Sequence, residues 1–164
     1  MDTSAFGPLY DLPAHLLRRA FQRTIALFDR EIGVFGITSP QLAVLNALQL
    51  CDGLQQREIG RAVGFDEATI GGIVARMARQ GLVERVRSSR SSRGWQVYLT
   101  VQGRALCQQV APRMEQQQRL TLEPLTLAEQ HELLRLLSKL TGVENSYWQA
   151  QDADANAPTA QRRR

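Results

Sequence analysis

The stretch QQREIGRAVGFDEATIGGIVARMARQGLVERV, residues 55–86, decides the fold that we expect for this chain. Residues 55–63 predict a short helix that ends at Gly64, because glycine readily adopts the left-handed conformation that closes helices. Asp66 then caps a second helix over residues 67–80. Two short helices joined by a tight turn are typical of a helix-turn-helix unit. The side chains of the second helix expected to face inward are Ile70, Val74 and Met77.

Two strand-like runs follow the helix pair. Residues 82–86 and 95–99 contain β-branched and aromatic side chains, and the eight-residue loop between them is polar and carries arginine. Such a pair predicts a β-hairpin wing. The expected fold is therefore mainly α-helical with a small β-hairpin wing, a winged helix-turn-helix with flanking dimerisation helices.

The basic residues are concentrated in this part of the chain. The net charge is only +4, but residues 68–104 contain seven arginines and a single acid, Glu84. A basic stripe confined to one segment is the footprint expected of a nucleic-acid face. The arginines are Arg76, Arg79, Arg85, Arg87, Arg90, Arg93 and Arg104.

The second helix of the pair is expected to lie in the major groove with its N-terminal residues against base edges. Thr69 suits a base edge, and Arg76 suits a phosphate. Gly71 and Gly72 weaken a helix, which indicates either close packing against a neighbouring helix or close approach to DNA. The wing arginines are expected in the minor groove. The predicted DNA contacts are Gln56, Arg57, Asp66, Glu67, Ala68, Thr69, Gly71, Gly72, Arg76, Arg87, Arg90 and Arg93.

Further helices are predicted to begin near Pro13 and after Thr38, Thr100 and Thr126. The first and last carry apolar stripes, which a two-fold homodimer would cover. The expected organisation is an N-terminal arm and dimerisation helix at residues 1–35, a winged helix-turn-helix DNA-binding domain at 38–103, C-terminal dimerisation helices at 104–148 and a disordered tail at 149–164.

Composition excludes several classes of protein. No run of 18 apolar residues exists, so no membrane partner is expected, and the N-terminus has no signal-peptide pattern, which favours a cytoplasmic location. No catalytic constellation, metal-ligand spacing or phosphate loop is present, so we expect neither an enzyme nor a cofactor. Cys51 and Cys107 fall in different predicted helices and are expected to be buried or half-buried thiols.

Residues 40–103 resemble the MarR family of winged-helix regulators. The matching pieces are QLAVL at 41–45, REIG at 57–60, DEATI at 66–70, VARMARQGLVER at 74–85 and YLTVQG at 98–103. The wing departs from the family pattern: the usual Asp-x-Arg is replaced by serine at 91 and 92 before Arg93. The resemblance implies interlocked terminal helices in a homodimer and a double-stranded, pseudo-palindromic operator with half-sites roughly 10 base pairs apart.

The resemblance also implies a repressor that a small aromatic carboxylate or phenolic ligand, or its thioester, releases from the operator. Residues 12–19 look like the first helix of relatives that sense aromatic acids. His15 and Arg19 share a helix face, so they could hold a carboxylate. The alternative is an ordinary helix start with surface arginines. The predicted ligand contacts are Tyr10, His15, Arg18, Arg19 and Phe35.

Two other functions remain open at this stage. One is an oxidation-sensing repressor on the same scaffold, using Cys51 or Cys107, which would need an exposed thiol of low pKa. The other is a winged helix that binds protein and never contacts DNA. A steep loss of duplex affinity with salt would distinguish a DNA-binding protein from the latter.

Overall fold

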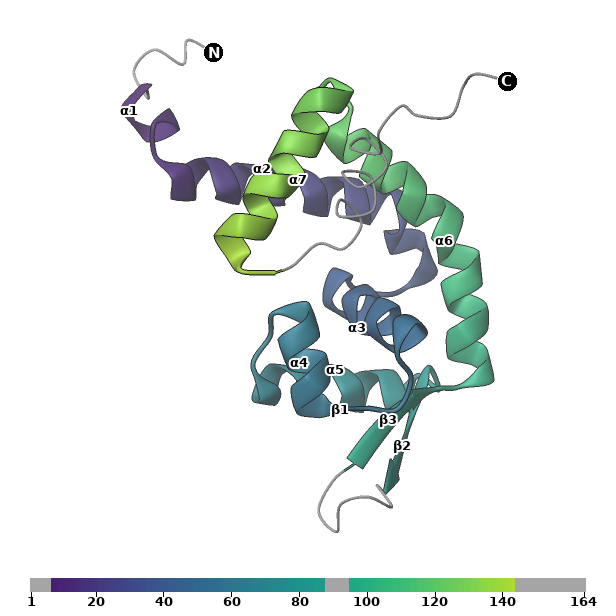
Figure 1. Ribbon diagram of the computed structural model, residues 1–164. Coiled ribbons are helices and arrows are strands. Elements are labelled where there is room, and N and C mark those ends of the chain that lie inside the picture. Colours follow the sequence, from purple (N-terminus) through teal and green to yellow (C-terminus); the bar gives the residue numbers. More distant parts are fainter. Residues whose placement is uncertain (1–6, 88–94, 144–164) are drawn as a thin grey trace, which may run out of the picture. The chain divides into compact units, whose positions relative to one another are not determined.

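The computed structural model describes residues 7–87 and 95–143, and its contacts form two compact units, Met1–Thr121 and Leu122–Arg164. The predicted tail at 149–164, together with Arg90 and Arg93, lies outside the described residues. The elements are α1 (Gly7–Tyr10), α2 (Pro13–Glu31), the 3₁₀ helix η2 (Gly33–Phe35), α3 (Ser39–Leu50), β1 (Leu54–Gln55), α4 (Gln56–Val63), α5 (Glu67–Arg79), β2 (Val83–Arg87), β3 (Trp95–Leu99), α6 (Val101–Leu122) and α7 (Leu127–Thr141) (Figure 1).

The predicted fold class is confirmed: helices predominate, and β1, β3 and β2 form a small antiparallel sheet in that order. The predicted helix pair and both wing strands are present as α4, α5, β2 and β3. Three elements were not predicted, namely β1, which pairs with β3, the single turn α1 within the N-terminal arm, and the 3₁₀ helix η2. The first long helix also ends earlier than expected, at Glu31 rather than near Phe35.

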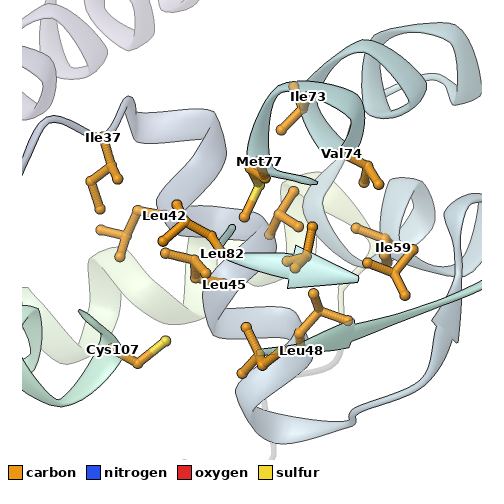
Figure 2. Close-up of a cluster of buried hydrophobic side chains, with 14 of the residues drawn as sticks. Ile37, Leu42, Leu45, Leu48, Ile59, Ile73, Val74, Met77, Leu82 and Cys107 are labelled. Carbon is orange, nitrogen blue, oxygen red and sulfur yellow. The ribbon is translucent and has the colours of Figure 1, made fainter. Parts of the chain in front are cut away.

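We call the winged helix-turn-helix, residues 38–103, the winged unit. Its core is formed by apolar side chains from α3, α4, α5 and the sheet, together with side chains of α6 (Figure 2). The prediction that α5 directs Ile70, Val74 and Met77 inward is confirmed, since all three are completely buried. Among the described residues, no helix is long and apolar enough to cross a membrane.

A hydrogen bond between two side-chain amides, one of them buried, connects the start of α3 to the end of α5. Thr38 and Gln41 form a capping box, in which the Thr38 backbone N–H donates to the side-chain oxygen of Gln41 at 2.9 Å. The side-chain amide of the buried Gln41 donates in turn to the side-chain oxygen of Gln80 at 2.7 Å. Buried polar groups need such partners, so this contact fixes the C-terminal end of α5.

The start of α6 is fixed against the residues that lead into β2. The Thr100 hydroxyl donates to the Gly81 carbonyl at 2.6 Å, and the Thr100 N–H donates to the Leu82 carbonyl at 3.2 Å. A β-carbon at Gly103 would overlap the carbonyl oxygen of Leu82. The close approach of two backbones therefore requires glycine at this position.

The C-terminal unit contains α7. The helix predicted after Thr126 is present, and Thr126 and Glu129 form its capping box, with the Thr126 N–H donating to the Glu129 carboxylate at 2.8 Å. The Gln130 side chain donates to the carbonyls of Leu122 and Leu125 at 3.2 and 3.0 Å, and the helix closes at Gly142 with φ +68°. Local hydrogen bonds alone thus account for both ends of α7.

Candidate nucleic-acid interface

The turn between α4 and α5 is tight because two glycines permit it. Gly64 has φ +75°, in the left-handed region, and closes α4. A β-carbon at the buried Gly60 would lie 2.7 Å from the Phe65 carbonyl oxygen, and the Phe65 N–H donates to the Gly60 carbonyl at 3.0 Å. This geometry determines where α5 begins.

Asp66 caps the first turn of α5. Its carboxylate accepts from the Thr69 N–H at 2.7 Å and from the Thr69 hydroxyl at 3.0 Å. These two hydrogen bonds from Thr69 lower the pKa of Asp66. Because the hydroxyl proton of Thr69 is directed to Asp66, the lone pairs of that oxygen are left to accept from an outside donor.

The first turns of α5 combine a buried side with an exposed polar side. Ile70, Ile73, Val74 and Met77 are buried. Most of the residues predicted to contact DNA from α4 and α5 are exposed, Gln56 and Gly71 being half-buried; the exposed ones are Arg57, Asp66, Glu67, Ala68, Thr69, Gly72 and Arg76. The structure thus brings this part of the predicted set, except Arg76 in the last turn of α5, to the N-terminal halves of the two helices.

The two helical glycines of α5 border open space. Among the described residues, a β-carbon at Gly71 would meet no atom within 4 Å outside its own helix turn, and one at Gly72 would meet only the Arg76 side chain at 3.8 Å. Packing against a neighbouring helix in the described part of the chain therefore does not explain them. Close approach of an outside molecule stays the prediction.

The wing strands place Arg85, Arg87 and Trp95 together. The guanidinium carbons of the two arginines lie 5.1 and 5.7 Å from the centroid of the Trp95 ring. The register of β2 and β3 sets Arg87 opposite Trp95. The sequence predicted Arg87 as a contact, but it did not single out Trp95, because the pairing register was unknown.

The basic stretch is largely uncompensated on this side of the molecule. Within residues 7–87 and 95–143, the ion pairs are Arg30–Glu31, Arg113–Glu31, Arg104–Asp52 and Arg135–Glu132. Arg104 is thus neutralised by Asp52. The described arginines of the stretch without a carboxylate within 4.0 Å are Arg76, Arg79, Arg85 and Arg87. Such unpaired cations suit a polyanionic partner.

A cavity of about 370 Å³ lies beside the start of α6. It has an apolar and amide lining, with no charged side chain: Phe35, Gly36, Ile37, Gln80, Leu82, Gln102, Ala105, Leu106 and Gln109. Phe35 is the one predicted ligand contact in this lining. The volume falls in the range of small-molecule sites.

The other predicted ligand contacts lie at the start of α2. The rings of Tyr10 and His15 meet edge to face with centroids 5.7 Å apart, and the guanidinium carbon of Arg19 lies 5.6 Å from the Tyr10 centroid. Arg18 is exposed. The structure therefore groups Tyr10, His15 and Arg19 and separates them from the cavity that contains Phe35.

The two cysteines differ from each other. Cys107 is buried, and burial raises the pKa of its thiol. Cys51 is exposed, so the expectation of a buried or half-buried thiol was wrong there. It follows the last turn of α3, beyond the buried Leu48. Among the described residues no cluster of side chains could hold a metal ion.

Comparison with known proteins identifies the family of this winged fold. A family model described as MarR family matches residues 35–94. The HTH-type transcriptional repressor NicR of Pseudomonas putida is 35% identical over 145 residues, which cover 84% of this chain and 92% of NicR. The chain belongs to the MarR family. It is a transcriptional regulator and not an enzyme, and the resemblance seen in its sequence is confirmed.

Solved structures of MarR-family regulators share the fold. PcaV of Streptomyces coelicolor, solved with its natural ligand, superposes with a TM-score of 0.77 at 34% identity, over 82% of this chain and 94% of PcaV. BpsR of Bordetella bronchiseptica, whose DNA binding is regulated by 6-hydroxynicotinic acid, has a TM-score of 0.74 at 33% identity, over 78% and 97% of the two chains.

Proposed function

We propose that this MarR-family regulator is a cytoplasmic homodimeric repressor that binds a pseudo-palindromic operator and leaves it when a small aromatic acid or phenol binds. The observation that carries the proposal is the first half of α5. There, small and polar residues are exposed on a helix whose opposite side is fixed in the core, beside arginines without acidic partners. A helix in this form fits a major groove, and the arginines fit phosphates.

The dimer is supported by apolar side chains on the terminal helices. Leu16, Leu17 and Phe21 of α2 are exposed, with Phe21 at 63%, and Leu136 and Leu140 of α7 are exposed as well. Large apolar patches on soluble chains mark interaction sites. A second copy of the chain would cover them, and its α5 would meet the second half-site of the operator.

The ligand is proposed to lie in the cavity beside α6. Phe35, Ile37 and Leu106 provide apolar walls for an aromatic ring, and the amides of Gln80 and Gln109 can bond a hydroxyl or ring nitrogen. The lining offers no cation for a carboxylate. His15 and Arg19 lie outside this lining and stay the predicted source of positive charge. A small-molecule ligand is supported by PcaV, solved with its natural ligand, and by BpsR, whose DNA binding 6-hydroxynicotinic acid regulates.

The DNA-binding part is tested by selecting bound duplexes from a random-sequence library and measuring the dissociation constant for the selected sequence. Thr69→Ala keeps the backbone N–H that Asp66 accepts but removes the hydroxyl, so affinity for the selected duplex is expected to fall about fivefold. Affinity for an unselected duplex is expected to change little. Equal losses on both duplexes would contradict base contact by Thr69, and no duplex binding at low salt would contradict the function.

The ligand part is tested by adding 6-hydroxynicotinic acid and a panel of benzoic acids to the protein–DNA complex. Leu106→Trp should fill the cavity and prevent release while DNA binding is retained. Leu50→Trp, at the exposed C-terminal end of α3, is the matched control for the bulk added. Release that survives Leu106→Trp but not His15→Ala would move the ligand site to the start of α2.

A further inference from the structure

One face of the wing holds two cations against one aromatic ring. Arg85 and Arg87 both lie over the ring of Trp95, which is 43% exposed. The register explains the contact, since Arg87 is opposite Trp95 and Arg85 is opposite the next residue on that face, Val97. Cross-strand neighbours of this kind are close enough to interact.

This face continues the buried face of the sheet beyond the edge of the core. Side chains alternate along a strand, so Arg85 and Arg87 share the face of the buried Val83, and Trp95 shares the face of the buried Val97. β2 is in contact with α5, and the buried Val83 and Val97 belong to the same cluster as Ile70 and Val74 of α5. The arginine pair therefore projects on the same side of the sheet as the recognition helix.

The pair is unusual because nothing acidic holds it. In the part of the chain that the structure describes, no carboxylate lies within 4.0 Å of Arg85 or Arg87. An acid would orient an arginine but would cancel its charge. The negative face of an indole ring attracts a guanidinium without neutralising its charge. The N–H groups at the edge of the guanidinium then stay free to donate to an anion.

We propose that Trp95 is a positioning residue, which holds the side chains of Arg85 and Arg87 so that they bind a phosphate group of duplex DNA on the α5 side of the wing. The proposal rests on the DNA-binding function proposed above. The contact would add affinity for any duplex and would not read its sequence, because phosphates carry no base information. Trp95 itself does not contact DNA.

The experiment measures fluorescence anisotropy of a labelled random-sequence duplex of about 30 base pairs between about 50 and 200 mM NaCl. Arg85→Gln and Arg87→Gln combined are expected to reduce the slope of log K against log salt by about 0.9, the value for one phosphate contact, for each wing that binds the duplex, and each single substitution is expected to reduce it by less. Arg119→Gln, an exposed arginine at the end of α6, is the matched control and should leave the slope unchanged.

Trp95→Leu keeps apolar bulk but removes the aromatic face, so the dissociation constant is expected to rise about fivefold with a reduced slope. Trp95→Phe should recover most of the loss, which a merely space-filling role would not predict. In a protein that already carries Arg85→Gln and Arg87→Gln, Trp95→Leu should not weaken DNA binding any further. Thermal unfolding of every variant identifies any that fails to fold.

Wild-type slope and affinity in Trp95→Leu would overturn the positioning role. A loss that persists without the two arginines would also overturn it, because Trp95 would then contact DNA directly. If the wild-type protein bound no duplex at low salt, the proposed function would fall and this inference with it. If the wild-type protein bound DNA and the Trp95 variants bound it with the same affinity, this inference alone would be wrong.

Discussion

The winged unit and the terminal helices use apolar side chains in opposite ways. In α3 and α5, Leu45, Ile70 and Met77 are completely buried by neighbours within the chain. In the first half of α2 and in α7, Phe21 and Leu140 are 63% and 67% exposed, and no described residue of α7 is buried. The first region completes its own core, whereas the second has apolar surface to offer to another molecule.

The boundary between the two behaviours runs through α2. Its second half contributes the buried Leu27 and Phe28, and hydrogen bonds attach it to α6. The Arg23 side chain donates to the Leu120 carbonyl at 2.9 Å, and the Gln117 side chain donates to the Thr24 carbonyl at 3.4 Å. A change in the core should therefore act on folding, and a change in the first half of α2 should act on association.

The largest effect is expected from Gly103→Ala, which tests how tightly the start of α6 packs against the backbone at Leu82. The added methyl group would overlap the Leu82 carbonyl, where two backbones cannot easily separate. We expect the free energy of unfolding to fall by about 3 kcal/mol, as in a severe case of overpacking. Urea denaturation measures it. A loss below about 1 kcal/mol would show that the start of α6 can move away from β2.

The next largest effect is expected from Phe21→Asp, which tests the exposed region. Loss of one buried aromatic contact at an interface corresponds to about 2 kcal/mol, or roughly a 30-fold rise in the dimer dissociation constant. Analytical ultracentrifugation measures this constant. Gln22→Asp introduces the same charge at the neighbouring exposed position and is the matched control. An unchanged dimer constant would mean that Phe21 faces solvent in the assembly.

The winged unit was predictable because its signals are local. Gly64 and Asp66 each determine a helix boundary within a few residues, and the structure has α4 ending and α5 beginning where those residues indicated. β1 was missed because two residues carry no periodicity. Its existence depends on pairing of Leu54 with Val97, 43 positions later in the numbering.

The ligand site was only partly predictable for the same reason. Helical spacing correctly brought His15 and Arg19 to one side of α2, where both meet Tyr10. Phe35 was grouped with them by resemblance, but it lines a cavity with Gln80 and Leu106. Three segments far apart in the sequence form that lining, and no spacing rule predicts which of their side chains leave space between them.

A smaller effect separates stability from DNA binding within the winged unit. Gly72→Ala replaces a helical glycine that borders open space, so the free energy of unfolding should rise by about 0.5–1 kcal/mol. Affinity for duplex DNA should fall, because the added methyl group keeps the backbone of α5 away from the groove. Denaturation and anisotropy measure the two quantities. A variant that is more stable and binds DNA as before would remove close approach as the reason for this glycine.

The smallest effect concerns the two helix caps, one in each unit. Hydrogen bonds from Thr69 lower the pKa of Asp66, and hydrogen bonds from Thr126 lower the pKa of Glu129. A carboxyl with a lowered pKa in the folded state stabilises the fold above its unfolded pKa of about 4, and this contribution is lost as the pH falls through the folded value.

The difference in melting temperature between wild type and Asp66→Asn should therefore be constant near neutral pH and shrink below about pH 4. Glu129→Gln should follow the same pH course, because both caps are local to one helix turn. If only the Glu129 difference varied with pH, the ionised Asp66 carboxylate would not be what stabilises the start of α5.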